Sequence, residues 1–206
     1  MKIRGKELVV AAIATGCTCW FGSSGAEEVA VPASGTVIVR QCDDGQRTAK
    51  FVEAGPGAFK MESRSGYRVA PLWAYVTGIV DELVRDGRVP YKDELIKGSL
   101  EGVRQLKVGS TFTADYRSVG QQGSYEQSHK VDVKEDRVVD TKASGRQRVI
   151  VVEHTIKSWN GDFTSSLVSH YSPELKAIVY SKYSEHHQRS MRSRSEECHL
   201  SEIRRP

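Results

Sequence analysis

Long apolar runs and glycosylation sites are both missing from this 206-residue sequence. Beyond residue 26 no apolar stretch approaches the roughly 20 residues of a membrane-spanning helix, so we expect no transmembrane segment. The only asparagine, Asn160, is followed by Gly161 and Asp162, which excludes an N-x-Ser/Thr glycosylation site. His-Glu-x-x-His and Gly-x-Ser-x-Gly motifs are also absent. We therefore expect a protein that is not an enzyme and that carries neither a catalytic metal nor a cofactor.

The first 26 residues are typical of an export signal. Lys2, Arg4 and Lys6 form a positive segment, the apolar core at positions 8–14 is short, and small residues occupy positions 24–26. We expect cleavage after Ala26 and a single domain over residues 27–206. The remaining 27 basic and 25 acidic residues give a net charge of +2, which makes an electrostatic case for nucleic-acid binding weak.

The four cysteines divide at the expected cleavage site. Removal of the leader discards Cys17 and Cys19 and leaves Cys42 and Cys198, which predicts one disulfide in an oxidising compartment. The alternative is a lipoprotein acylated at Cys17, which Gly16 favours and Ala14 disfavours. We expect a periplasmic or secreted protein, with the lipoprotein as the second choice.

Most of the chain has the composition of β-strands. A turn signal at residues 43–45 separates extended segments at 36–42 and 47–53, which predicts a hairpin. Further strands are expected at 58–62, 111–117, 128–134, 137–142, 146–158, 163–171 and 177–183. Between two of these, Asn160-Gly161 favours a tight hairpin turn at residues 159–162.

The spacing of apolar residues predicts one helix. Pro71 precedes and Gly87 follows a stripe at three- and four-residue steps, formed by Leu72, Val76, Ile79, Val80, Leu83 and Val84. A second helical or turn-rich piece is expected at residues 92–105. The fold class is therefore α+β and mainly β: a curved antiparallel meander sheet, half-barrel or sandwich-like, packed on one or two helices.

Two motifs resemble a group of uncharacterised bacterial periplasmic proteins. Residues 106–113 (LKVGSTFT) are similar to the "PLxVG" entry of that group into its sheet, with Gln105 in place of proline. Residues 170–179 (HYSPELKAIV) are similar to its "WYSPELGxVV" hairpin, with His170 for tryptophan and Lys176 for glycine. The resemblance covers residues 106–183 and implies a fold like the half-open barrel of periplasmic lipoprotein carriers. It implies no catalytic residues.

Three sets of residues are candidates for a site. The helix and the curved sheet predict an apolar groove, for which the residues are Leu72, Trp73, Tyr75, Val76, Ile79 and Leu83. A tail rich in arginine suggests a patch for an anionic partner, formed by Arg189, Arg192 and Arg194, although an edge strand protected by charge explains the same residues. Adjacent histidines, His186 and His187, point to opposite faces of a strand and make a poor metal site.

These features favour a non-enzymatic exported protein of the cell envelope that binds an apolar, lipid-like ligand or a protein partner. One alternative is a structural or assembly factor that docks a partner through its sheet edge or arginine-rich tail. The other is a metal-dependent envelope hydrolase, which no motif supports. The oligomeric state, ligand and partner are left open by the sequence.

Overall fold

The computed structural model describes residues 25–206 except 65, 79–81, 86–87 and 121–122. Residues 1–24 of the expected leader, with Cys17, therefore lie outside the described residues. The elements are β1 (Glu27–Glu28), β2 (Val37–Cys42), β3 (Gly45–Ala54), β4 (Ala58–Ser63), β5 (Gly66–Pro71), α1 (Ala74–Thr77), β6 (Glu82–Arg85), β7 (Arg88–Gly98), η1 (Glu101–Arg104), β8 (Gln105–Leu106), β9 (Thr111–Gly120), β10 (Gly123–Thr141), β11 (Gly145–Ser158), β12 (Phe163–Ser172), β13 (Ala177–His187) and β14 (Arg192–Arg204).

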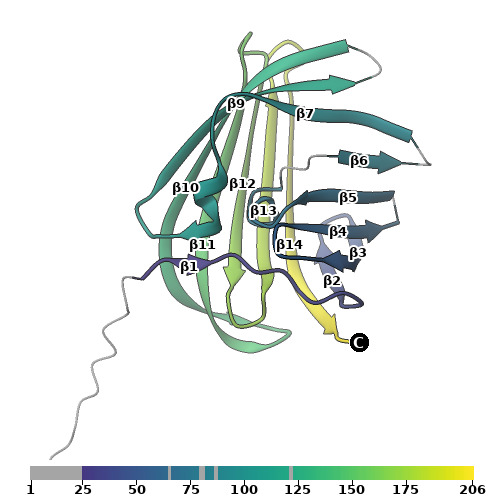
Figure 1. The fold of residues 1–206 in the computed structure, drawn as a ribbon, viewed down its shortest axis with the longest axis vertical. Coiled ribbons are helices and arrows are strands. Elements are labelled where there is room, and N and C mark those ends of the chain that lie inside the picture. The colour runs from purple at the N-terminus through teal and green to yellow at the C-terminus, as the bar shows by residue number, and fades with distance from the viewer. Residues whose placement is uncertain (1–24, 65, 79–81, 86–87, 121–122) are drawn as a thin grey trace, which may run out of the picture.

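A large antiparallel sheet dominates the molecule. Its hydrogen-bonded order is β10-β11-β12-β13-β14-β2-β3-β4-β5-β6-β7-β9, and β9 also pairs with β10. Strands β10–β14, which we call the long strands, stand upright in Figure 1, and strands β2–β7 lie across them at the right. A separate pair, β1 with β8, attaches the N-terminal segment. The expected antiparallel, mainly β architecture is confirmed.

The expected hairpins are confirmed at several places. β2 and β3 flank the turn at 43–44, and β11 and β12 flank the turn at 159–162 with the boundaries at Ser158 and Phe163. The strands expected at 128–134 and 137–142 are instead one strand, β10. Its register shifts between Val133 and Glu135, so a β-bulge occupies the place where a turn was expected.

The predicted helix over residues 72–84 is wrong beyond its first turn. α1 ends at Thr77 because Gly78 adopts the left-handed conformation (φ 73°) and its N–H donates to Ala74 O. The chain then returns as β6, which pairs with β5 and β7. Residues 92–105 are also mostly extended, since β7 runs to Gly98 and only the four-residue 3₁₀ turn η1 follows.

The apolar core forms where α1 packs against β5, β11 and β12. Phe51 and Tyr75 meet edge to face at 5.6 Å between ring centroids, and Phe59 meets Tyr75 in the same way at 5.7 Å. Tyr171 has no exposed surface, and its hydroxyl donates to Ala30 O and accepts from Ala30 N at 2.9 Å each. Tyr171 therefore ties the N-terminal segment to the core.

Candidate functional site

The interior side chains of the long strands change from apolar to polar along the molecule. On β10 the inward positions run Val133, Val131, His129, Gln127, and β11 carries Ile150, Val152 and His154 in the same direction. On β12 they run Tyr171, Ser169, Leu167, Ser165, and on β14 Leu200, Cys198, Glu196, followed by the exposed Arg194. We call the half near the β10–β11 and β12–β13 turns the apolar half. The polar half is the upper part of Figure 1, near the β11–β12 and β13–β14 turns.

Two buried histidines form a hydrogen-bonded chain in the polar half. His154 Nδ1 lies 2.7 Å from Thr77 O, and His154 Nε2 lies 3.1 Å from His129 Nδ1. A carbonyl oxygen can only accept, so His154 Nδ1 carries a proton and its Nε2 accepts from His129 Nδ1. His129 Nε2 is then a bare acceptor, and it is buried with no hydrogen-bond partner among the described residues.

Burial keeps both imidazoles neutral. Burial, together with the smaller effect of the neighbouring His154, lowers the pKa of His129 to about 3. Burial likewise lowers the pKa of His154 to about 4, against the opposing effect of the hydrogen bond to Thr77. Desolvation penalises the charged form of an imidazole, so neither ring is a cation at neutral pH.

Further polar groups of this half are hydrogen-bonded to one another. Gln127 Nε2 donates to Ser118 Oγ at 2.9 Å, and Ser118 Oγ donates to Asp93. On β13, Tyr183 OH donates to Glu185 Oε2 at 2.6 Å. Burial, together with that hydrogen bond, raises the pKa of Tyr183. These contacts satisfy most of the polar atoms that the sheet buries, as stable interiors require.

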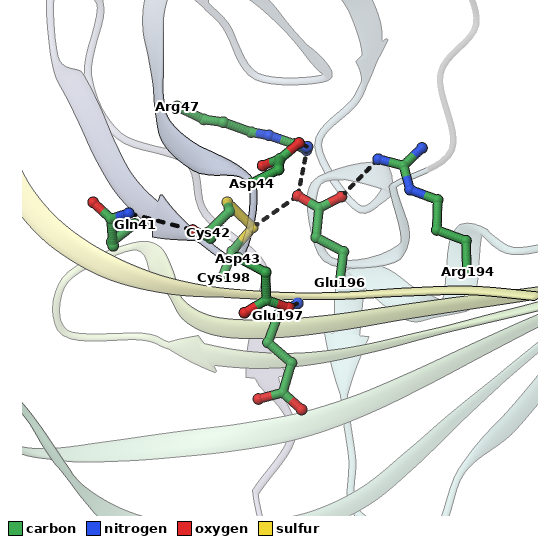
Figure 2. The surroundings of a disulfide bond; sticks show 9 residues. All are labelled: Gln41, Cys42, Asp43, Asp44, Arg47, Arg194, Glu196, Glu197 and Cys198. Atoms are coloured by element: carbon green, nitrogen blue, oxygen red, sulfur yellow. Dashed lines mark hydrogen bonds and ion pairs between the residues drawn. A yellow bond between two sulfur atoms is a disulfide. The ribbon is translucent and has the colours of Figure 1, made fainter.

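The expected disulfide between Cys42 and Cys198 is confirmed. The two residues face each other across β2 and β14, with their Cα atoms 4.0 Å apart and 156 positions apart in sequence. Figure 2 shows the carboxylate of Glu196 beside the bridge, with Oε1 3.5 Å from Cys198 Sγ. Disulfides persist in oxidising compartments, so the bridge favours such a compartment for this chain.

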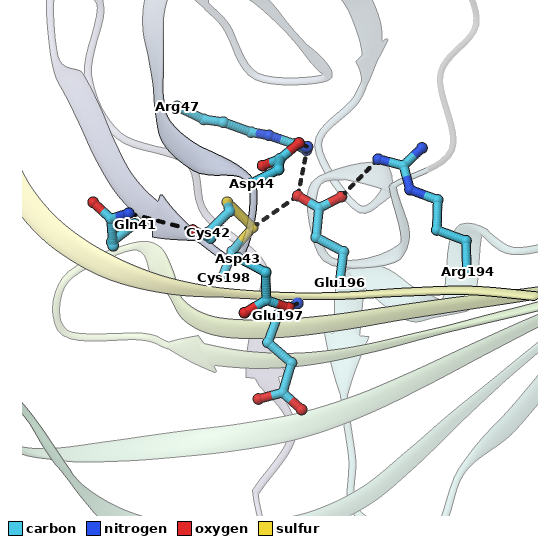
Figure 3. A network of polar contacts seen from close by, with 9 residues as sticks. All are labelled: Gln41, Cys42, Asp43, Asp44, Arg47, Arg194, Glu196, Glu197 and Cys198. Carbon is cyan, nitrogen blue, oxygen red and sulfur yellow. Dashed lines mark hydrogen bonds and ion pairs between the residues drawn. A yellow bond between two sulfur atoms is a disulfide. The ribbon is translucent and has the colours of Figure 1, made fainter.

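Glu196 is buried and carries two arginine partners. Its carboxylate lies 2.5 Å from the guanidinium of Arg47 and 3.2 Å from that of Arg194, and Arg47 also pairs with Asp44 at 2.7 Å (Figure 3). Within the described residues, the one group of potential metal ligands consists of Cys42, Glu196 and Cys198. A thiolate is the ligand form of cysteine, so the disulfide withdraws both sulfur atoms from metal binding.

Two open depressions lie on the described surface at the polar half. One, of about 590 Å³, is lined by Arg117, Ser124, Tyr125, Glu126, Ser158, Trp159, Asn160, Asp162 and Phe163. The other, of about 500 Å³, is lined by Thr164, Ser165, Ser166, Ser184, Glu185, His186, Ser193, Arg194 and Ser195. The first contains two exposed aromatic residues, since Trp159 is 59% and Tyr125 55% exposed. We call it the Tyr125–Trp159 depression.

The residues predicted for an apolar groove lie mainly in the packed core. Trp73, Tyr75 and Val76 are buried there, and Leu72 packs against the same cluster. Leu83 lies on β6 between Arg68 and Tyr91 in register, and Ile79 lies outside the described residues. The groove remains a prediction.

Two of the three arginines in the predicted patch form ion pairs with carboxylates. Arg189 pairs with Asp162 at 2.7 Å, and Arg194 pairs with Glu196. Arg192 lies at the start of β14. This strand pairs with β13 on one side and β2 on the other, so the predicted final edge strand is wrong.

The adjacent histidines of β13 do not share a site. His186 Nδ1 lies 2.9 Å from Ser193 Oγ, whereas the ring of His187 packs against Phe163 with centroids 4.9 Å apart. Sequence reasoning missed the pair that does meet, His129 with His154. The sequence did contain a signal: each histidine occupies an inward position of a strand whose other inward positions are apolar. These positions are His129, Val131 and Val133 on β10, and Val152 and His154 on β11.

Comparisons with known proteins give little further information. No protein-family model and no curated protein matches the chain. Among solved structures, the chain is similar to the hypothetical lipoprotein YmcC from Escherichia coli, with 10% identity and a TM-score of 0.44 over 82% of this chain and 84% of that one. The function of this chain is therefore argued from its own residues. Within the described residues, no helix is long and apolar enough to cross a membrane.

Proposed function

We propose that the protein is an exported, non-enzymatic binding protein whose site is the Tyr125–Trp159 depression. The observation that carries the proposal is the exposure of two large aromatic side chains in one depression of about 590 Å³. That volume lies within the range of about 300–1,000 Å³ typical of ligand sites. The disulfide supports export, because such a bridge forms in oxidising compartments.

The backbone around the depression is fixed before any ligand arrives. Trp159 N donates to Glu126 O at 3.1 Å, which joins the β11–β12 turn to β10. Asp162 N donates to Asn160 Oδ1 at 3.1 Å within the turn, and Phe163 N donates to Ser158 Oγ at 2.9 Å. Preorganisation of this kind lowers the entropy cost of binding.

A lipid-like ligand at α1 and a partner docked on the arginine-rich tail are less well supported. Trp73 and Tyr75 fill the core, and Arg189 and Arg194 already have carboxylate partners. The residues of the apolar groove are therefore engaged in packing, and two of the three arginines of the tail are engaged in ion pairs.

Trp159 supplies the test, because it is exposed whereas Trp73 is only 7% exposed. The purified protein from residue 27 onward is titrated with neutral oligosaccharides, an anilinonaphthalene dye and an acidic peptide, and acrylamide quenching of tryptophan is measured. We expect one class to protect Trp159, and Tyr125→Ala to abolish that protection. Val138→Ala, at an exposed site on the other half of β10, is the control. Failure of every probe class to protect Trp159 would refute the proposal.

A further inference from the structure

We propose that the ligand of the Tyr125–Trp159 depression is an uncharged saccharide, which rests on the proposed function. Tyr and Trp each combine a broad apolar face with a polar edge. A pyranose ring has the complementary form, with a face of C–H groups and a rim of hydroxyl groups. A lipid would need a continuous apolar lining, whereas the lining here combines three aromatic residues, Tyr125, Trp159 and Phe163, with six polar or charged ones.

The polar residues of the depression are suited to hydroxyl groups. Arg117 and Glu126 supply a planar guanidinium and a planar carboxylate held together at 2.6 Å, and both line the depression. Such paired planar groups present donors and acceptors side by side, which matches two adjacent hydroxyls of a sugar. The hydroxyl groups of Ser124 and Ser158 add short polar side chains on the same lining, whereas the amide of Asn160 is hydrogen-bonded to Asp162 through both of its polar atoms.

The charges at the depression cancel. The Arg117 guanidinium is paired with Glu126, and the Asp162 carboxylate with Arg189 at 2.7 Å. A charged ligand would have to break one of these ion pairs to find a counter-charge, whereas an uncharged one binds without doing so. Because exposed ion pairs weaken with salt and stacking does not, binding should depend little on ionic strength.

The sequence of the β11–β12 turn explains how Trp159 is held in an exposed position. Asn160 and Gly161 make the turn, with Gly161 at φ 74°, and the two hydrogen bonds between Ser158 and Phe163 close it. Trp159 is therefore held at the start of a closed turn with 59% of its surface exposed. Together with Tyr125 on the same lining, Trp159 forms an exposed aromatic patch, and contiguous exposed apolar surface is typical of interaction sites.

The test uses the disulfide-bonded chain from residue 27 with maltohexaose, cellohexaose and mannohexaose as probes, followed by titration calorimetry at about 20 and about 500 mM NaCl. We expect at least one hexasaccharide to bind, with an affinity that changes less than about twofold between the two salt concentrations. Trp159→Ala should weaken binding about tenfold or more, while Trp159→Phe should retain part of it. Val138→Ala is the matched control on a distant exposed apolar residue.

The outcomes separate the two proposals. If the dye or the acidic peptide protects Trp159 and no hexasaccharide does, the saccharide inference is wrong and the proposed function stands. Strong loss of binding in high salt, or full binding by Trp159→Ala, would also overturn the inference. If no probe of any class protects Trp159, both fail. Unchanged thermal unfolding of the Trp159 variants shows that a loss of binding is not a loss of fold.

Discussion

The buried side chains of the apolar and polar halves of the long strands are stabilised by different interactions. In the apolar half, Val131, Ile150 and Tyr171 are at most 1% exposed and belong to the core cluster that surrounds α1. In the polar half, other buried positions carry histidine, serine and glutamate, and the histidines and Glu196 there are stabilised by hydrogen bonds and ion pairs. The first half specifies the fold through packing. The second half carries polar interior groups next to the depression that we propose as a binding site.

The largest expected effect concerns the disulfide, which lies where the polar half meets β2. Replacing both cysteines, Cys42→Ala with Cys198→Ala, should lower the free energy of unfolding by about 4–5 kcal/mol, because the bridge closes a loop of 156 positions in the unfolded chain. Each single variant should lose about as much as the double variant. Urea unfolding with and without reductant measures the effect. Equal stability in both conditions would show that the bridge contributes nothing.

The next prediction compares two buried residues, one apolar and one polar. Ile150→Ala should cost about 3 kcal/mol, because it removes a core side chain that is 1% exposed and leaves a cavity. Ser169→Ala, at a site with no exposed surface, should be neutral or stabilising, because its hydroxyl has no hydrogen-bond partner among the described residues. Equilibrium unfolding in urea measures both. A large loss for Ser169→Ala would mean that the hydroxyl is satisfied by bound water.

Acid should weaken the polar half selectively. His129 and His154 have pKa values of about 3 and about 4 in the folded state, below their ordinary value, so the unfolded chain binds more protons below about pH 6.5. Stability is therefore fully present above pH 6.5 and falls as the pH is lowered toward 4, by about 2 kcal/mol for each histidine at pH 5.

Unfolding curves between pH 7.5 and pH 5 measure this loss. The double variant His129→Leu/His154→Leu should lose the part of the pH dependence that these two residues contribute, and His170, whose pKa burial also lowers to about 4, keeps its own share. The variant also removes the hydrogen bond between His154 and Thr77 O at every pH. His186→Gln, at an exposed residue, should keep the acid dependence of the wild type. If the double variant retains the full slope, other groups are responsible for it.

The features that could be predicted from the sequence are those encoded in short segments, by alternating apolar residues, by turn residues or by the number of cysteines. The β2–β3 hairpin, the 159–162 turn and the Cys42–Cys198 pair all follow from short patterns. The predicted helix over 72–84 is wrong beyond its first turn because apolar residues at helical spacing also fit a single helical turn, α1, followed by the short strand β6. Gly78 gave the correct signal, since a left-handed glycine ends a helix.

The site could not be predicted in the same way. Tyr125 and Trp159 are 34 positions apart, and only the pairing of β10 with β11 brings their segments together, with Gln127 opposite Ser158. The histidine pair likewise depends on register, because His129 lies one step diagonally from His154 on the neighbouring strand. Which residues meet across two strands depends on the register of their pairing, and the pattern of apolar residues within one strand does not determine that register.

The smallest expected effect tests the turn between β12 and β13, in the apolar half. Lys176 has φ 53°, a left-handed conformation that costs a residue with a Cβ atom roughly 1 kcal/mol and costs glycine almost nothing. Lys176→Gly should therefore raise the free energy of unfolding by up to about 1 kcal/mol, reduced by the greater entropy of glycine in the unfolded chain. Lys182→Gly, on the neighbouring strand β13, should be destabilising, because glycine weakens a strand interior. Thermal unfolding of both variants checks the contrast. If Lys176→Gly also destabilised the protein, the side chain of Lys176 would have to contribute more than its backbone conformation costs.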